Sequence, residues 1–419
     1  MKRVLAVTAL ALCAPLARAQ AFQNLASYVA LGDSLTAGVV SSSLVVTHQR
    51  ASFPALIARS AALPAFEQPT VSEPGLPAEL VLQSLLPSPV IVPKSATPGA
   101  PTNLALPRPY GNLGVPGATA QDMLTRTSDA GGSHDLVLRG LGTAVEQAIA
   151  LRPSVITLWI GNNDVLGAAV RGRAIDGVTL TPAAAFRSSY EQIVAALKPT
   201  GASIVAANLP DVTTIAFVTA ISRFATNPAT GQPVLIDGQP VPLIGPSGPL
   251  PEGSYVLLSA SSLLAQGIGV PASLGGKGTP LPDEVVLDPN EVAIVKDRVA
   301  ADNRAIRDVC GAAGIPVFDF NAFLKRATSE GLNYGGVRLS GAFLSGGLFS
   351  YDGVHPTEIG YAAIANGFID VINANGGSLE RVDVGAPLGI RSAAGAALPE
   401  LSWEALQALL QAFPPLDRP

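Results

Sequence analysis

The chain has 419 residues, of which 48% are hydrophobic and 14% are charged. This length and apolar fraction are enough to fill a substantial core, which excludes a disordered protein. The formal net charge is -5, from 26 Lys and Arg against 31 Asp and Glu, so the sequence does not provide the basic surface that binds phosphate backbones. We therefore expect no nucleic acid among its partners.

The first 19 residues have the pattern of a signal peptide. Lys2 and Arg3 precede an apolar stretch that ends in the small-x-small sequence Ala17-Arg18-Ala19. We expect residues 1–19 to be removed and the mature protein to be exported, either to a periplasm or out of the cell.

Cysteine usage and hydropathy limit what the mature protein can be. A lipoprotein would be acylated at Cys13, but the preceding Leu12 is larger than the small residue expected there. Beyond the leader only Cys310 remains, so we expect no intrachain disulfide. No later stretch reaches the roughly 18 to 20 consecutive apolar residues that span a bilayer. We therefore expect a soluble protein whose apolar composition suits peripheral contact with lipid surfaces. The sequence does not indicate whether the protein is a monomer or an oligomer.

Short β-branched segments alternate with helical patterns along the chain. Strands are predicted at 27–31, 154–160, 203–207 and 316–320. Helices are predicted at 182–198 with Thr181 as N-cap, from about 290 to 313 before Gly314, and from about 356 to 374 before Gly376 and Gly377. Such alternation predicts an α/β fold with a parallel sheet covered on both faces.

Two long segments interrupt this alternation, at about 41–110 and 223–287. Residues 64–110 contain eleven prolines and no clean periodicity, which indicates an irregular excursion over the surface. The second segment holds one apolar run, Tyr255 to Ile268, that could form a short helix or a strand. Segments this long are often functional, for example as a lid, but decoration without a function is equally open.

The domain prediction follows from these segments. We expect one domain over 20–380 that contains both insertions, followed by a tail at 381–419. The tail has one amphipathic patch at 403–413, which is more typical of a helix packed on the body than of a membrane anchor.

The segment from Tyr28 to Gly38 is an apolar strand that ends in Gly32-Asp33-Ser34. Open α/β sheets place their sites at the carboxyl ends of parallel strands, where a helix is about to begin. The N–H groups of that helix would point at an anion formed there. Ser34 is therefore a candidate nucleophile, although Ser and Asp are also favoured as simple helix caps.

A serine nucleophile needs a base, and the chain offers three histidines. His48 and His134 lie in polar, loop-like contexts and are interpreted as surface residues. His355 comes just before a helix, with Asp352 three residues earlier. That spacing lets Asp352 accept a hydrogen bond from one ring nitrogen while the other faces a serine. Asp-x-x-His could also be half of a metal site, but no third ligand stands at a suitable spacing, so we expect no metal and no cofactor.

Two further segments are candidates for donors to an oxyanion. Residues 112–119 are predicted to form a small-residue turn in which Gly117 could bring its N–H close to a substrate. Asn163 follows the strongest predicted strand, and its amide could donate to developing negative charge. Taken separately, each segment is better interpreted as a plain turn.

Together the four segments resemble, in order, the motif blocks of the SGNH (GDSL) hydrolase family, over roughly residues 25–375. The resemblance implies that Ser34 attacks the acyl carbon, that His355 acts as base and then acid, and that Asp352 orients His355. It also implies an oxyanion hole from the Ser34 and Gly117 N–H groups and the Asn163 side chain. The implied fold is a three-layer α/β/α sandwich around a five-stranded, flavodoxin-like parallel sheet.

The expected function is hydrolysis of carboxylic esters by an esterase or lipase, through an acyl-enzyme intermediate. The apolar composition weakly favours an acyl or lipid ester as substrate. One alternative is a deacetylase of exported polysaccharide, for which more aromatic residues than 5% are expected. Another is a non-catalytic, surface-binding protein that keeps the fold. The Gly-x-Ser-x-Gly motif of α/β-hydrolases is absent.

Overall fold

The computed structural model describes residues 22–84, 90–227, 230–334, 336–385 and 400–401. The predicted signal peptide at 1–19 and the amphipathic patch at 403–413 lie outside these residues.

A five-stranded parallel sheet forms the centre of the molecule. Its strands are β1 (Tyr28–Gly32), β4 (Asn112–Gly114), β5 (Val155–Trp159), β6 (Ser203–Ala207) and β13 (Val317–Phe318). They lie in the order β13-β6-β5-β1-β4, and every adjacent pair is parallel. Numbered as they follow one another in the chain, the order is 2-1-3-4-5, which is the flavodoxin-like arrangement. The predicted sheet is thus confirmed.

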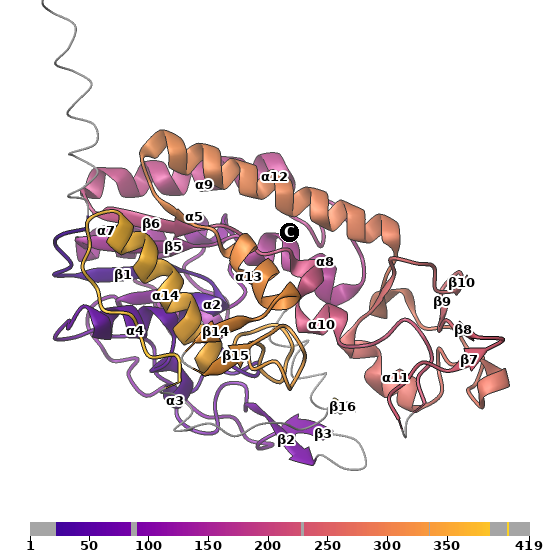
Figure 1. Cartoon of the computed structure of the whole chain (residues 1–419). Coiled ribbons are helices and arrows are strands. Elements are labelled where there is room, and N and C mark those ends of the chain that lie inside the picture. Colours follow the sequence, from indigo (N-terminus) through magenta and orange to yellow (C-terminus); the bar gives the residue numbers. More distant parts are fainter. Residues whose placement is uncertain (1–21, 85–89, 228–229, 335, 386–399, 402–419) are drawn as a thin grey trace, which may run out of the picture.

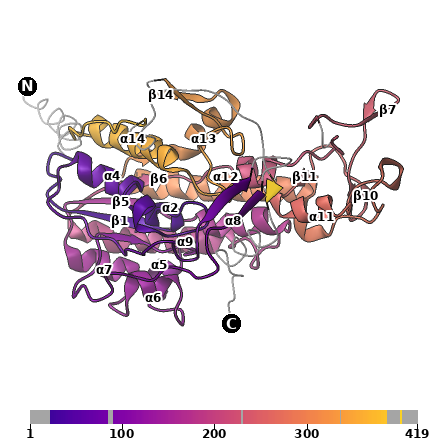
Figure 2. The same cartoon turned by 90° about the horizontal axis from the view of Figure 1, so that it is seen from below.

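Helices cover both faces of this sheet. On one side α4 (Phe53–Ser60) packs against α14 (Glu358–Ala374), which also contacts β6 and β13. On the other side α7 (Ala144–Leu151) contacts β1 and α9 (Ala183–Leu197), and α12 (Pro289–Ala313) packs on α9. Figure 2 shows α4 and α14 on one side of the strands and α7 on the other. The three-layer α/β/α sandwich is therefore also confirmed.

The predicted helix ends hold to within two residues. α12 ends as predicted at Gly314, whose φ of 69° gives the left-handed cap. α14 begins two residues late because the Thr357 side chain accepts from the Gly360 N–H as N-cap. The prediction that Thr181 caps α9 is wrong, since Pro182 occupies that position. Both backbone groups of Thr181 are already used: its N–H donates to the Asp164 carbonyl, and its carbonyl accepts from Arg298.

The predicted turn at 112–119 is only partly correct. Its first three residues form β4, which pairs with Ala30 to Gly32 of β1, and the turn begins after Gly114. Asn112–Gly114 contains no β-branched residue, so nothing in its composition predicts a strand. All three residues are buried, and this burial beside β1 stabilises a strand that the composition does not favour.

Several short elements complete the body around the sheet. They are α2 (Ser34–Ala37), α3 (Val46–Gln49), α5 (Asp122–Thr125), α6 (Ser133–Leu138), α8 (Asn162–Arg171), α10 (Ala216–Thr219), α13 (Phe320–Ser329), and the hairpin of β14 (Leu332–Tyr334) and β15 (Val337–Leu339). In the first long segment, β2 (Leu80–Ser84) and β3 (Val90–Pro93) are antiparallel, and β16 (Glu400–Leu401) pairs with β3. Among the described residues, no helix is long and apolar enough to cross a membrane.

Segment 223–287 lies at one end of the molecule (Figures 1 and 2), beyond α10 in Figure 1. It has a small core of its own, with Leu243, Val256 and Leu281 among its buried side chains. The apolar run predicted at 255–268 contains both a strand and a helix. The elements of this segment are β7 (Leu235–Ile236), β8 (Gln239–Pro240), β9 (Ile244–Gly245), β10 (Gly248–Pro249), β11 (Tyr255–Val256), α11 (Ser261–Ala265) and β12 (Val286–Leu287).

Candidate active site

Ser34 is the first residue of α2, directly after the end of β1. Asp33 is the N-cap of this short helix, and its Oδ1 accepts from the Leu35 N–H at 3.0 Å. The cap therefore fixes the turn that carries the serine. Ser34 itself is 5% exposed, at the carboxyl edge of the sheet.

The sheet register brings three of the four predicted segments to this edge. Gly32, at the end of β1, pairs with Gly114 at the end of β4 and with Trp159 at the end of β5. A β-carbon added at Gly114 would lie 2.4 Å from the Ala37 N, so α2 can approach β4 this closely only beside a glycine. The segments that follow the three strands therefore begin side by side, at the point where the strand order reverses.

Asn162 joins two of these segments. Its Nδ2 donates to Oδ2 of Asp33 at 2.8 Å, so the Asp33 carboxyl is held from both sides. Burial raises the pKa of Asp33 to about 6, although the hydrogen bonds from Asn162 and Leu35 and the electrostatic interaction with His355 act in the opposite direction. A hydrogen bond from the Ser42 N–H to Oδ2 of Asp352, at 2.6 Å, joins the chain after α2 to the segment that carries His355.

Gly117 and Asn163 are joined through the intervening loop. The Asn163 Nδ2 donates to the carbonyl of Ala118 at 2.9 Å. Because a primary amide has two N–H groups, this bond fixes the amide plane without using the second one. Gly117 has a φ of +83°, and a β-carbon added there would meet no atom within 4 Å. The backbone at Gly117 thus borders open space and has a conformation that favours glycine.

Asp352 and His355 form a fully enclosed pair. His355 Nδ1 lies 2.7 Å from Oδ2 of Asp352, which also accepts from the Ser42 N–H at 2.6 Å. The other oxygen, Oδ1, accepts from the N–H groups of Val354 and His355, each at 2.8 Å. Burial alone would raise the pKa of Asp352, but the interaction with His355 and the hydrogen bonds outweigh it and hold this pKa below its ordinary value.

The turn between Asp352 and His355 is packed against α10. Gly353 has a φ of +70°, and its carbonyl accepts from the Phe217 N–H at 2.8 Å. A β-carbon at Gly353 would lie 2.8 Å from that nitrogen. Since α10 leads into segment 223–287, this segment is attached next to the turn that carries His355.

The two other histidines are not simple surface residues, so that interpretation is wrong. His134 is 4% exposed, and its Nδ1 lies 3.0 Å from Asp129. His48 Nδ1 lies 2.8 Å from Glu358, and its Nε2 lies 2.7 Å from Glu79. Burial alone would lower the pKa of His48, but the two carboxylates raise it to about 9. His48 is therefore a cation that links the first long segment to the first turn of α14.

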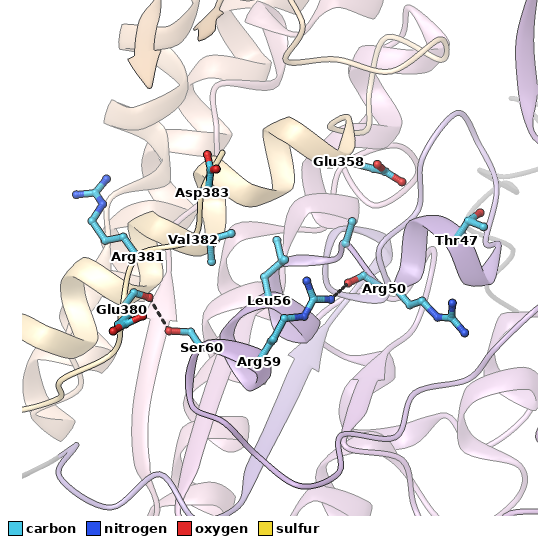
Figure 3. Close-up of a pocket in the computed structure, with 11 residues that line it drawn as sticks. Thr47, Arg50, Leu56, Arg59, Ser60, Glu358, Glu380, Arg381, Val382 and Asp383 are labelled. Atoms are coloured by element: carbon cyan, nitrogen blue, oxygen red, sulfur yellow. Dashed lines mark hydrogen bonds between the residues drawn. The ribbon is translucent and has the colours of Figure 1, made fainter. Parts of the chain in front are cut away.

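A cavity of about 470 Å³ lies beside this link, between α4 and the chain that follows α14 (Figure 3). Its lining includes Arg50, Arg59, Glu358, Glu380 and Asp383. None of the predicted site residues lines it. In the described part of the chain, no group of three or more His, Cys, Asp or Glu is arranged to hold a metal ion.

Comparisons with known proteins bear on what this edge of the sheet does. Residues 28–368 match the family model of GDSL-like Lipase/Acylhydrolase. No curated protein matches the chain in sequence. Two solved structures resemble it in part. One is described as a lipolytic protein of the G-D-S-L family, from Desulfitobacterium hafniense DCB-2, with 13% identity and a TM-score of 0.35 over 83% of this chain and 99% of that one.

The other is phospholipase A1 from Streptomyces albidoflavus NA297, with 14% identity and a TM-score of 0.32 over 84% of this chain and 100% of that one. The family model spans all four predicted segments, from the strand before Ser34 to the helix after His355. The chain therefore belongs to the GDSL-like lipase/acylhydrolase family of hydrolases.

Proposed function

We propose that this protein hydrolyses carboxylic esters through an acyl-enzyme intermediate, with Ser34 as the nucleophile. The observation that carries the proposal is the Asp352–His355 pair, 2.7 Å apart and buried, in a chain of an acylhydrolase family. A buried carboxylate that accepts from Nδ1 selects the tautomer whose Nε2 can accept a proton.

In the first half of the reaction, His355 Nε2 takes the proton of the Ser34 hydroxyl as Oγ attacks the acyl carbon. The imidazolium that forms lies against the Asp352 carboxylate, which stabilises it without taking its proton. His355 then returns the proton to the leaving alcohol. In the second half His355 takes a proton from a water molecule as the water attacks the acyl carbon. The bond from that carbon to Ser34 Oγ then breaks, His355 gives the proton back to Oγ, and the carboxylic acid is released.

The oxygen of the attacked carbonyl becomes negatively charged and needs donors already in place. We assign this role to the backbone N–H groups of Ser34 and Gly117 and to the Asn163 side chain. Three observations support the assignment: Ser34 begins a helix, Gly117 borders open space, and the Asn163 amide is oriented by Ala118.

For the substrate we propose an ester with an apolar acyl chain, and for the protein a site of action at lipid surfaces outside the cytoplasm. The signal-peptide pattern of residues 1–19 and the positive mean hydropathy of +0.38 support these assignments. Amino-terminal sequencing of protein collected outside the cytoplasm tests export: a mature chain that begins at Gln20 supports it, and retention of Met1 contradicts it.

The mechanism is tested by titration with a p-nitrophenyl alkylphosphonate. One equivalent of p-nitrophenol should be released, and peptide mass spectrometry should find the phosphonyl group on Ser34. Ser34→Ala should release none, whereas Ser43→Ala, which changes another buried serine, should react like the wild type. Absence of an adduct, or an adduct on a different residue, would contradict the assignment.

A further inference from the structure

Asp302 is a buried carboxyl group on α12 with no role in the mechanism above. Its exposed fraction is 0%, and neither of its carboxyl oxygens receives a hydrogen bond from the described residues. An ionised carboxylate in such a place is costly, because nothing replaces the water that would solvate it. A neutral carboxylic acid avoids this cost and also becomes a hydrogen-bond donor.

The neighbour of Asp302 can be identified from the face of α12 on which it lies. Arg298, one turn earlier, donates to the carbonyl of Thr181 and pairs with Asp176 at 2.7 Å. The N–H of Thr181 donates to the carbonyl of Asp164 at 2.8 Å. Through Thr181, this face of α12 is therefore linked to the backbone of Asp164, and α12 packs on α8, the helix that contains Asp164. The two charged groups that act on Asp302 are Asp164 and Arg298.

The pKa of Asp302 agrees with a position close to Asp164. Burial first, and then the negative charge of Asp164, raise the pKa of Asp302 to about 8, although Arg298 acts to lower it. Two adjacent buried carboxyl groups cannot both be ionised without a large cost, so one of them keeps its proton.

We propose that Asp302 is a neutral carboxylic acid that donates a hydrogen bond to the Asp164 carboxylate, and that this carboxyl pair positions the loop of the oxyanion hole. Asp164 connects this carboxyl pair to the loop that contains Gly117, because its Oδ2 accepts a hydrogen bond from the Ala120 N–H at 2.9 Å. It also directly follows Asn163. Asp302 is thus a positioning residue that touches no substrate, and its effect on catalysis rests on the function proposed above.

The pair itself is tested by stability against pH, which needs no enzymatic activity. The folded-state pKa of Asp302 is raised above its unfolded value, so the stability it contributes is present below about pH 4 and is lost as the pH rises towards 8. Asp302→Asn keeps a neutral donor and removes this titration. The unfolding temperature of the wild type should fall relative to that of Asp302→Asn, by several degrees between pH 5 and 9.

Asp308→Asn, at an exposed position of the same helix, controls for the loss of one negative charge and should run parallel to the wild type. Parallel curves for Asp302→Asn and the wild type would overturn the protonated pair. They would do so even if the protein hydrolysed no ester, so this failure is distinct from failure of the proposed function.

The positioning role is tested by ester kinetics at pH 7. Asp302→Leu removes the donor, and we expect kcat to fall about tenfold or more with KM changed less than about twofold, because the oxyanion donors act mainly in the transition state. Asp302→Asn should stay within about threefold of wild-type kcat. An equal loss in both variants, or none in either, would overturn the role. If Asp302→Leu does not fold, a large loss of kcat in folded Asp302→Asn would overturn it just as well.

Discussion

The side chain of Asn162 donates from Nδ2 to Oδ2 of Asp33 across 2.8 Å, and this bond joins the ends of β5 and β1. Asp33 caps the helix that begins with Ser34, while Asn162 directly precedes Asn163. One buried hydrogen bond therefore couples the turn that carries the proposed nucleophile, Ser34, to a candidate oxyanion donor. Substitution of Asn162 removes this hydrogen bond and tests its role.

Asn162→Ala should lower both stability and kcat. It removes a donor from a buried carboxyl group, which typically costs about 1–3 kcal/mol, and it frees the turn that carries Ser34. Urea unfolding and ester kinetics measure the two effects. Asn373→Ala is a suitable control, since Asn373 holds both backbone groups of Leu379 after α14. It should lose stability with kcat unchanged; an equal kcat loss in both variants would contradict the coupling.

Asn163→Ala should lower kcat by about 10²–10³, with little change in KM. The reason is that a donor to the oxyanion acts on the transition state more than on the bound ester. Steady-state kinetics on a p-nitrophenyl ester give both constants. A rise in KM at constant kcat would instead indicate that Asn163 binds the ground-state substrate.

Asp352→Asn should lower kcat by roughly 10³ or more, because the uncharged amide no longer stabilises the imidazolium and can favour the wrong tautomer of His355. Circular dichroism should show that the fold is kept. The hydroxyl of Ser350 lies 3.2 Å from Oδ1 of Asp352, so Ser350→Ala is a milder change at the same carboxylate. Wild-type kcat in Asp352→Asn would remove Asp352 from the mechanism.

His48→Gln should destabilise the protein by about 2 kcal/mol at neutral pH, since hydrogen bonds to charged partners contribute about 1.5–3 kcal/mol. The pKa of His48 is raised from 6.5 in the unfolded chain to about 9 in the folded one. The stability it contributes is therefore present below about pH 6.5 and lost as the pH rises through 9.

The difference in unfolding free energy between wild type and His48→Gln should accordingly shrink between pH 6.5 and 9. Adding Glu358→Gln to His48→Gln should cost less than Glu358→Gln alone, since their shared interaction is already lost. A difference that stays constant with pH would show that His48 does not titrate in this link.

A chain-length series of p-nitrophenyl esters should show kcat/KM rising from acetate to longer acyl chains. Each additional buried methylene contributes about 0.8 kcal/mol if the acyl site is apolar. A preference for acetate alone would contradict the proposed lipid substrate and favour a deacetylase.

The sheet could be predicted from the sequence because it depends on local patterns, and the candidate site residues were chosen by their positions at the ends of its strands. Strands β1, β5 and β6 are apolar runs, and Ser34 and Asn163 follow two of them. Parallel strands bring such positions to one edge of a sheet, so no long-range information was needed. β4 was missed because burial, not composition, makes it a strand.

The supporting contacts were not predictable in this way. His48 pairs with Glu358 across 310 positions, and a polar loop context gave no hint of that partner. Asp302 is an acidic residue in an amphipathic helix, where exposure is the ordinary expectation. The packing of α12 on the body of the protein buries it.

The most direct test of the central claim is hydrolysis of short and long p-nitrophenyl esters by the purified protein and by Ser34→Ala. We predict measurable turnover by the wild type and a fall to background in Ser34→Ala, with the unfolding temperature nearly unchanged. Turnover in Ser34→Ala equal to that of the wild type would contradict Ser34 as the nucleophile.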